Sequence, residues 1–348
     1  MSRALHESAV LDIAPANSDF LSEVLSGLSR TPPTLPCKFF YDARGAALFQ
    51  KICEQSEYYI TRTELLILNE NRAEIASQLG DSIELIGLGT GAGTKTRILL
   101  EELKDPVAYV PVDISDKQLQ KSTAAFRRLL PRLEILPVCA DYLQPVLLPS
   151  PQRTPRRNVV YFPGSTIGNF EPADAAAFLR RIADLGGQRG ALLIGVDLQK
   201  DRQTLERAYN DSAGVTAEFN LNLLVRANHE LGADFDIAHW RHQAIYNSKE
   251  GRIEMYLISA IDQTVRVRDR QRSRREPGDV DLDPQGLTSR EASHQFHFVA
   301  GEKIITEYSY KHSREGFIAL AASAGFSFER FWTDDSQLFG LFYFTVKL

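Results

Sequence analysis

A glycine-rich segment is the clearest sign of chemistry in this chain. Residues Gly87 to Thr96 read GLGTGAGTKT, directly after the apolar run Ile83 to Ile86 and before a helix-like segment. Glycines let the backbone turn sharply and bring bare amides against a ligand. With Ala92 in the last place, the segment also satisfies the dinucleotide pattern GxGxxG/A from Gly87. The turn predicts a nucleotide-type cofactor and leaves NAD and S-adenosylmethionine (SAM) both open.

Two acidic residues follow the next two predicted strands. Asp113 ends the strand in AYVPVDIS, and Asp141 with Tyr142 follows the strand in PVCADYL. A carboxylate at Asp113 would accept both hydroxyl protons of an adenosine ribose, and Asp141 with Tyr142 would meet the adenine. The alternative for both carboxylates is a cap for the segment that follows. Lys95 either reaches a carboxylate of the cofactor or is a solvated lysine.

A polar loop comes after a further predicted strand. Residues Phe162 to Phe170 read FPGSTIGNF. In a parallel sheet, Gly164 to Asn169 would lie at the same carboxyl edge as the glycine turn. We interpret this loop as one that holds the substrate beside the cofactor.

Histidine and cysteine spacing favours neither metal nor covalent chemistry. Two HxxH pairs lack the glutamate or third ligand that zinc requires, namely His239 with His242 and His294 with His297. No GxSxG motif or recognisable Cys/His pair is present in the sequence. We therefore expect no metal, and a reaction that depends on positioning its reactants.

Composition favours a cytoplasmic enzyme that acts on a small molecule. The net charge of -5 and the pI near 5.9 provide no general attraction for polyanions, so we expect no nucleic-acid partner. Three widely spaced cysteines indicate a reducing compartment. The N-terminus has no apolar leader and the chain has no long uncharged apolar run, so we expect neither export nor membrane insertion.

The middle of the chain alternates short aliphatic runs with helical patterns, which is typical of βαβ units. We predict strands at Ile83 to Leu88, Val107 to Asp113, Leu133 to Cys139, Asn158 to Phe162 and Ala191 to Val196. Helices are predicted at Thr96 to Leu103, Lys117 to Leu129 and Pro172 to Ala183. This pattern predicts a doubly wound α/β core, to which strands at Phe326 to Thr333 and Gly340 to Lys347 return.

The flanking segments predict a second, discontinuous α+β domain that binds the substrate. We assign residues 1–63 and 201–310 to it, and residues 64–200 and 311–348 to the cofactor domain. Its expected strands are Ala244 to Asn247, Arg252 to Ala260 and Gln295 to Val299. Residues Arg266 to Arg290 are rich in Arg, Pro, Gly and acidic residues, so we expect a surface loop there, with a phosphate or RNA contact as the alternative.

Seven segments in order resemble a known family: KFFYDARGAALFQKICEQSEYYITRTE, GLGTGAGTKT, YVPVDIS, GSTIGNFEP, RAYNDSAGVTAEFN, RIEMYL and ITEYSYKHS. The chain is similar from about Leu35 onward to the histidine-specific, SAM-dependent methyltransferases of ergothioneine biosynthesis. The resemblance implies a Rossmann-like methyltransferase domain with a discontinuous substrate domain. It also implies three methylations of the α-amino group of L-histidine, which yield hercynine.

The resemblance assigns roles residue by residue. Cofactor contacts would fall on Gly89, Lys95, Asp113, Asp141 and Tyr142, and substrate contacts on Tyr58, Asn169, Tyr209, Met255, Glu307 and Ser309. In the family, the equivalents of Asn169 and Tyr209 hold the amine and carboxylate of the substrate, and those of Glu307 and Ser309 hold its imidazole. That pairing suits an imidazole, because a carboxylate accepts from one ring nitrogen while a hydroxyl serves the other.

The reaction requires that the amine lose a proton and be aligned for attack. Tyr41 or a water molecule would take the proton of the amine, and Asn169 would align the amine for attack. The family usually has an acidic residue in place of Gly87, so Gly87 and Gly93 leave the local geometry open.

We expect the protein to be a monomer. The competing hypotheses for its function are an NAD-dependent oxidoreductase, a non-catalytic amino-acid sensor and a methyltransferase for another amine.

Overall fold

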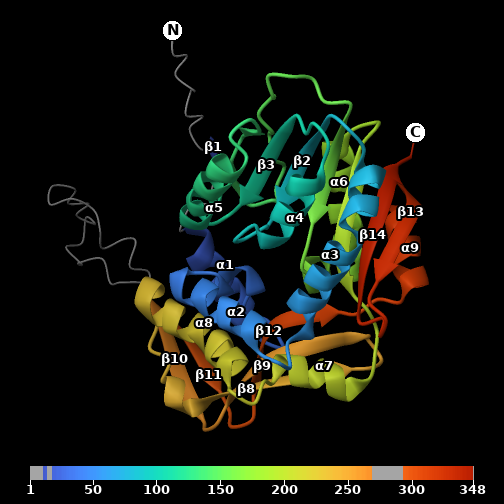
Figure 1. The fold of residues 1–348 in the computed structure, drawn as a ribbon. Coiled ribbons are helices and arrows are strands. Elements are labelled where there is room, and N and C mark those ends of the chain that lie inside the picture. Colours follow the sequence, from blue (N-terminus) through green and yellow to red (C-terminus); the bar gives the residue numbers. More distant parts are fainter. Residues whose placement is uncertain (1–10, 14–17, 269–292, 348) are drawn as a thin grey trace, which may run out of the picture. The chain divides into compact units, whose positions relative to one another are not determined.

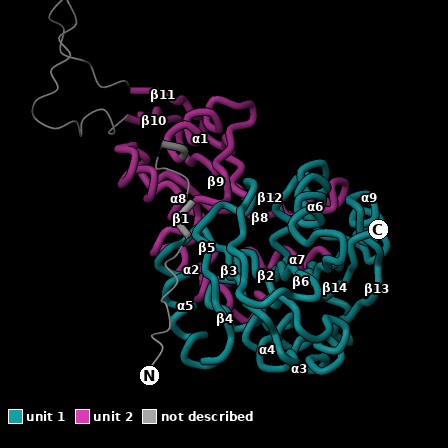
Figure 2. Tube along the Cα trace, turned by 90° about the horizontal axis from the view of Figure 1, so that it is seen from above, with its two compact units in different colours: residues 1–15, 59–200, 309–348 teal, residues 16–58, 201–308 magenta. Residues whose placement is uncertain are grey.

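The computed structural model describes residues 11–13, 18–268 and 293–347. The chain divides into two compact units (Figure 2). Unit 1 comprises Met1–Pro15, Tyr59–Lys200 and Ser309–Leu348, and unit 2 comprises Ala16–Tyr58 and Asp201–Tyr308. All five predicted cofactor residues belong to unit 1, whose sheet positions them.

Unit 1 contains a mostly parallel sheet with helices packed on it (Figure 1). Its strands follow the order β1 (Leu11–Ile13), β5 (Val138–Ala140), β3 (Ala108–Asp113), β2 (Ile83–Leu88), β6 (Arg157–Phe162), β7 (Ala191–Asp197), β14 (Phe339–Val346) and β13 (Phe326–Thr333), while β4 (Glu134–Ile135) pairs with β3. Only the β7–β14 and β14–β13 pairs are antiparallel in this sheet. This arrangement confirms the doubly wound α/β prediction.

Helices cover both faces of the sheet in unit 1. In β7, Ile194 lies in the apolar cluster that also contains Phe178 of α6 (Pro172–Gly186) and Phe317 of α9 (Arg314–Ser323). The next residue, Gly195, faces α3 (Tyr59–Leu79), where a Cβ would lie 2.5 Å from Glu64 Oε1. Since successive residues of a strand face opposite sides, α6 and α9 cover one face of the sheet and α3 covers the other. The strands therefore read as continuous apolar runs.

The strand order places the expected ligand edge. The chain runs from β2 to β3 on one side and later from β6 to β7 on the other, so its direction of travel reverses between β2 and β6. Ligands bind at such a switch point, beyond the carboxyl ends of the strands. The glycine turn, the residues after β3 and the loop after β6 all begin at this edge, where α4 (Thr94–Glu102), α5 (Asp116–Leu129) and η2 (Thr166–Asn169) start.

Unit 2 combines helices with two small sheets. The helices are α1 (Ser18–Leu28), η1 (Cys37–Phe40), α2 (Ala43–Glu54), α7 (Arg202–Tyr209), α8 (Val215–Leu231) and η3 (Ile237–His239). One sheet has the order β12 (Lys303–Tyr310), β9 (Arg252–Ser259), β8 (Trp240–Asn247), and the other pairs β10 (Gln263–Arg268) with β11 (Ser293–Phe298). The Asp42 carboxylate caps α2 and also accepts from Asn222 Nδ2 of α8 at 2.9 Å, which ties these two helices together.

Some predicted elements differ from the observed ones. The strand expected at Leu133 to Cys139 is split into β4 and β5, because Pro137 has no amide hydrogen to continue the ladder. Residues 266–268 of the expected surface loop belong to β10, and residues 269–290 lie outside the described residues. The sequence places residues 1–63 in the second domain, whereas β1 pairs with β5 in the sheet of unit 1.

Candidate active site

The glycine turn requires glycine for two separate reasons. Gly89, Gly91 and Gly93 all have positive φ, a conformation that other residues rarely adopt. A Cβ on Gly93 would lie 2.5 Å from the Phe126 ring, and one on Gly87 would lie 2.6 Å from Thr90 Cγ2. The two glycines that depart from the family pattern are thus explained by packing.

Asp113 and Asp141 each form a local turn at the carboxyl edge of the sheet. Asp113 Oδ1 accepts from the Ser115 amide at 3.0 Å, and Asp141 Oδ1 accepts from the Leu143 amide at 2.9 Å. Ser115, not Asp113, occupies the N-cap position of α5. Burial raises the pKa of Asp113, although amides of Ser115, Gly91 and Ile114 oppose the shift. A desolvated carboxylate next to a glycine turn is typical of a ligand-binding group.

Tyr142 lies against the glycine turn. A Cβ on Gly89 would come within 3.2 Å of the Tyr142 ring, and that ring packs edge-on against Phe162 with centroids 5.6 Å apart. The structure therefore brings together Gly89, Asp113 and Tyr142, which the resemblance assigns to the cofactor.

Lys95 is held by a residue to which the sequence assigns no role. Its Nζ lies 2.5 Å from Glu64 Oε2, and its side chain is 17% exposed while that of Glu64 is wholly buried. The same Glu64 oxygen accepts from the Gly164 amide at 2.9 Å. The interpretation of Lys95 as a solvated lysine is therefore wrong. Glu64 links α3, the glycine turn and the loop after β6, and the only sequence signal for it is its place in the YYITRTE segment.

The loop after β6 is fixed by its backbone contacts. Ser165 adopts φ 59, and its hydroxyl accepts from the Asp197 amide at 2.8 Å. Gly168 is packed so closely on the end of β12 that a Cβ would lie 2.7 Å from the Tyr310 carbonyl. These contacts fix the backbone of the loop and thereby the position of the Cα atom of Asn169, the last residue of η2.

An aromatic cluster in unit 2 brings together the predicted tyrosines. The Tyr58 and Tyr209 rings lie 6.3 Å apart and edge-on, and Phe49 contacts both Tyr58 and Tyr41. Tyr41 also packs on Phe219, with centroids 5.7 Å apart. Burial, followed by the nearby Tyr209, Cys53, Tyr41 and Glu307, raises the pKa of Tyr58 well above its usual range. Tyr58 therefore remains a phenol that can donate a hydrogen bond at neutral pH.

Tyr209 is positioned through its backbone by a partly buried histidine, His242. Its carbonyl accepts from His242 Nε2 at 2.8 Å, and His242 Nδ1 accepts from Asn220 Nδ2 at 2.9 Å. Because a carbonyl can only accept, Nε2 must carry the hydrogen. Both ring nitrogens are thus used within the protein, and burial lowers the pKa of His242.

Within the described ranges, no group of three His, Cys, Asp or Glu side chains is arranged to hold a metal.

The two predicted imidazole ligands share one strand. Glu307 and Ser309 are two residues apart on β12, so their side chains leave the same side of the strand. Met255 lies on the neighbouring strand β9, and Thr306 donates to its carbonyl at 3.2 Å. Ser309 and Met255 are both buried, and Ser309 Oγ accepts from Lys311 Nζ at 2.8 Å. Tyr256 donates to Glu254 on the same β9 strand.

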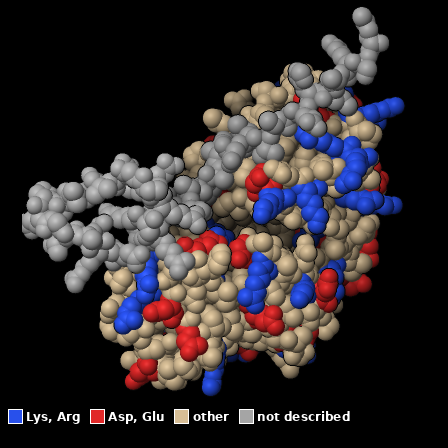
Figure 3. Space-filling model, turned by 90° about the vertical axis from the view of Figure 1, so that its left-hand side faces the viewer, with Lys and Arg blue, Asp and Glu red and all other residues tan. Residues whose placement is uncertain are grey.

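The surface carries side chains of both charge signs. Figure 3 shows side chains of Lys and Arg as well as of Asp and Glu on the face that it draws. No helix in the described part of the chain is long and apolar enough to span a membrane.

The sequence matches the family of histidine-specific, SAM-dependent methyltransferases over residues 20–346. The chain belongs to this family. The match decides between the cofactors that the glycine turn left open, so the protein is a SAM-dependent methyltransferase and the NAD-dependent alternative is wrong.

Similar curated proteins agree with this assignment. The chain is 40% identical to the histidine N-alpha-methyltransferase of Mycolicibacterium smegmatis and 39% identical to that of Mycobacterium tuberculosis, with 92% of each chain covered in both cases. It is also 30% identical to ergothioneine biosynthesis protein 1 of Neurospora crassa, where the match covers 85% of this chain and 34% of the relative.

The residues at the carboxyl edge suit SAM. Positive φ at Gly89 and Gly91 turns the backbone sharply after β2, and the desolvated Asp113 carboxylate follows the neighbouring strand. A carboxylate at that position can accept from both ribose hydroxyls, and the backbone of such a turn can approach a ligand closely.

Proposed function

We propose that the protein is an L-histidine N-alpha-methyltransferase that transfers three methyl groups to the α-amino nitrogen and yields hercynine. The full-length similarity to two histidine N-alpha-methyltransferases, at 40% and 39% identity, is the observation that carries this proposal. We further propose that it acts in the cytoplasm as a monomer.

The cofactor half of the proposal uses five residues of unit 1. When bound, SAM would supply a methyl group from its sulfonium; the amine would attack the methyl carbon in line, and S-adenosylhomocysteine would leave as the neutral thioether. Asp113 would accept from the ribose, Asp141 and Tyr142 would bind the adenine, and Gly89 would allow the backbone to approach. Lys95 would bind the methionine carboxylate, and the Glu64 carboxylate at 2.5 Å holds its ammonium in place.

The substrate half of the proposal rests on complementary hydrogen bonding. Glu307 would accept from one imidazole nitrogen and Ser309 would serve the other, while Met255 packs beside them. Asn169, Tyr58 and Tyr209 would hold the amine and carboxylate, and the pKa of Tyr58 keeps its phenol a donor. An indole or phenol ring would replace only one of the two hydrogen bonds that an imidazole would make with Glu307 and Ser309, and a lost hydrogen bond of this kind costs about 1–3 kcal/mol in a dry pocket.

The reaction needs a neutral, aligned amine. An α-amino group titrates near about 8, so loss of its proton is only modestly uphill at neutral pH. Most of the rate would then come from alignment by Asn169 and Tyr209. Tyr41 or water would take the proton, and the faces of Tyr41, Tyr58 and Phe219 would stabilise the growing cationic charge of the product.

Competition among free amino acids tests the substrate assignment. Purified protein is given SAM with equal concentrations of L-histidine, L-tryptophan and L-tyrosine, and methylated products are separated by mass. We expect histidine to be consumed first. Comparable turnover of tryptophan would contradict the imidazole site, and turnover of another amine alone would keep the methyltransferase but change its substrate.

A further inference from the structure

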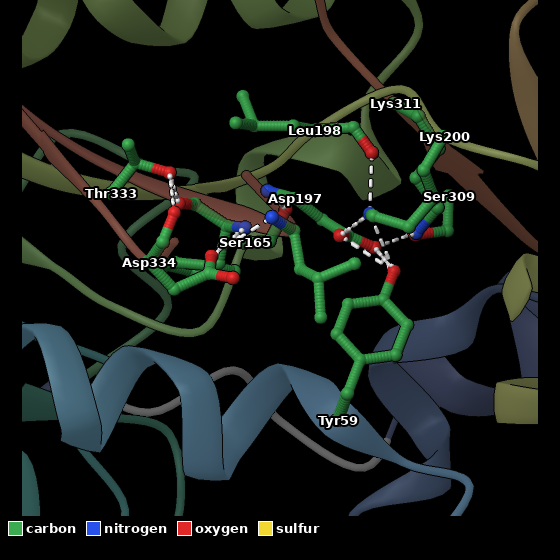
Figure 4. A network of polar contacts seen from close by, with 11 residues as sticks. Tyr59, Ser165, Asp197, Leu198, Lys200, Ser309, Lys311, Thr333 and Asp334 are labelled. Carbon is green, nitrogen blue, oxygen red and sulfur yellow. Dashed lines mark hydrogen bonds and ion pairs between the residues drawn. The ribbon is translucent and has the colours of Figure 1, made fainter. Parts of the chain in front are cut away.

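The chain passes between the two units at four points, three of which lie in the described residues. These three points, the crossings, are at residues 58/59, 200/201 and 308/309, and the fourth is at 15/16. At or just beyond each crossing, unit 1 contributes a side chain to a cluster around the wholly buried carboxylate of Asp197, the last residue of β7. Figure 4 shows this Asp197 cluster, which consists of Tyr59, Asp197, Lys200 and Lys311.

Each crossing has its own bond to the Asp197 carboxylate. At the first crossing, the Tyr59 hydroxyl donates to Oδ1 at 2.7 Å, and at the second, Lys200 Nζ lies 2.6 Å from Oδ1. At the third, Lys311 Nζ lies 2.8 Å from Oδ2 and donates to Ser309 Oγ at 2.8 Å. Lys200 Nζ also donates to the Tyr59 hydroxyl at 2.7 Å. The three crossings are therefore joined to one another within unit 1.

Stability alone does not explain these buried charges. Burial acts to raise the pKa of Asp197, but Lys311 and Lys200 outweigh it and keep this pKa below its usual value. Burial lowers the pKa of Lys200, although Asp197 opposes the shift. The Lys200 ammonium is thus less favourable in the folded protein than in the unfolded chain. Since apolar residues of similar volume often serve stability as well as buried ions do, the cluster needs an explanation in what it holds in place.

Residues with a proposed role in substrate binding lie beside all three crossings. Tyr58 directly precedes the first crossing. The second is followed by α7, which Asp201 caps and which ends at Tyr209. Strand β12 runs through the third, with Glu307 before it and Ser309 after it. The proposed cofactor residues, in contrast, are far along the chain from each of these crossings.

We propose that the Asp197 cluster positions the substrate-binding residues, because it fixes the backbone at the three crossings beside which they lie. This inference rests on the proposed function. Lys200 is the positioning residue that tests it most cleanly. Its ammonium has three hydrogens, and its three hydrogen bonds go to Tyr59, Asp197 and the Leu198 carbonyl. An effect of Lys200 on the substrate is therefore exerted through the cluster rather than through a bond to the ligand.

Lys200→Met removes the ammonium and keeps a side chain of similar length. It leaves Asp197 with Lys311 and the Tyr59 hydroxyl as partners, so we expect the variant to fold. At saturating SAM, kcat/KM for histidine should fall by about five- to a hundredfold, since a misplacement of about 1 Å can cost the larger factor. Calorimetric titration should give a Kd for S-adenosylhomocysteine within about twofold of the parental value, as expected for sites that are not coupled.

Tyr59→Phe and Tyr343→Phe form a matched pair of variants. Both hydroxyls belong to buried tyrosines of unit 1 and bond a charged group at 2.7 Å, which is Asp197 for Tyr59 and Arg157 for Tyr343. Arg157 begins β6 and so lies at the opposite, amino edge of the sheet. We expect Tyr59→Phe to lower kcat/KM for histidine as Lys200→Met does. Tyr343→Phe should keep the parental kcat/KM even if its melting temperature falls.

Hydrogen exchange of the ligand-free protein, followed by mass spectrometry, gives a readout that needs no substrate. Lys200→Met should speed exchange in peptides that span all three crossings, and leave peptides of β2 and β3 at the parental rate. Faster exchange at the second crossing alone would overturn the proposal, because Lys200 would then hold only its own segment.

The kinetic outcomes separate this inference from the proposed function. If the parent protein methylates histidine, an unchanged kcat/KM in Lys200→Met or an equal fall in Tyr343→Phe overturns the inference alone. Binding of S-adenosylhomocysteine that weakens as much as kcat/KM falls would also overturn it, since unit 1 would then be loosened as a whole. A parent protein that does not methylate histidine would refute the proposed function and this inference together.

Discussion

Replacing Asp113 with asparagine should separate cofactor binding from stability. Burial raises the pKa of Asp113 in the folded protein, so the ionised carboxylate is less favourable there than in the unfolded chain. For a carboxyl group with a raised pKa, the folded state loses stability as pH rises through the ordinary pKa, and the loss persists at neutral pH. Asp113→Asn removes this loss and keeps an oxygen for the Ser115 amide, now 3.0 Å away. We expect the ligand-free variant to melt at or above the parental temperature.

Binding should change in the opposite direction. In the proposed site, the carboxylate accepts two ribose hydroxyls, and hydrogen bonds to a charged group are worth about 1.5–3 kcal/mol against about 0.5–1.5 for neutral ones. The asparagine amide can accept from one hydroxyl at most through its oxygen. We expect S-adenosylhomocysteine binding to weaken by about 1–3 kcal/mol, or roughly 5- to 150-fold in Kd.

The assay pairs thermal melts without ligand with calorimetric titration of S-adenosylhomocysteine. The control is Asp334→Asn, because Asp334 is a buried carboxylate whose oxygens accept amides of Leu338 at 2.8 Å and Ser336 at 3.1 Å. This variant should lose stability and keep the parental Kd. If Asp113→Asn instead behaves like Asp334→Asn, then Asp113 only holds a turn and the reasoning is refuted.

Three further predictions concern other parts of the chain. Glu307→Ala should raise KM for histidine roughly ten- to a hundredfold, since it removes a hydrogen bond to a charged group worth about 1.5–3 kcal/mol; an unchanged KM in steady-state kinetics would count against the imidazole role. Gly93→Ala should cost about 2–4 kcal/mol in urea unfolding, because it combines φ 76 with a Cβ 2.5 Å from Phe126. Gly214→Ala, at the same left-handed conformation with φ 73 and no atom within 4 Å of its Cβ, should cost only about 1–2 kcal/mol, and equal losses would refute the packing argument. Burial lowers the pKa of His312 from 6.5 to about 4, so neutral His312 contributes stability that is lost as pH falls from about 6.5 to 4, on the order of 3 kcal/mol in all. His312→Phe should flatten unfolding free energy against pH in that window, and a curve parallel to the parent would contradict this.

The sheet could be predicted from the sequence because its strands are buried on both faces. Such strands are continuous apolar runs between turn residues, and β2 was predicted at the observed bounds Ile83–Leu88. The sequence does not predict the split between β4 and β5, because its apolar pattern continues through Pro137. In the structure the Leu136 amide still donates to the Tyr109 carbonyl, but Pro137 has no amide hydrogen and the ladder is interrupted there.

The residues that support the site could not be predicted in the same way. A buried glutamate such as Glu64 looks the same in a sequence as a solvated one, and only the fold brings it to Lys95 and Gly164. The same holds for Asp197 and Lys311, which form a buried ion pair although they are far apart in the chain. Their partners are set by tertiary structure, which local patterns do not encode.

Mass spectrometry of a reaction between the purified protein, L-histidine and excess SAM tests the central claim most directly. We expect a final product with three added methyl groups, all on the α-amino nitrogen, and mono- and dimethylated forms that appear and then decline. Methyl groups on the imidazole ring, or histidine that remains unmodified while another amine is methylated, would contradict it.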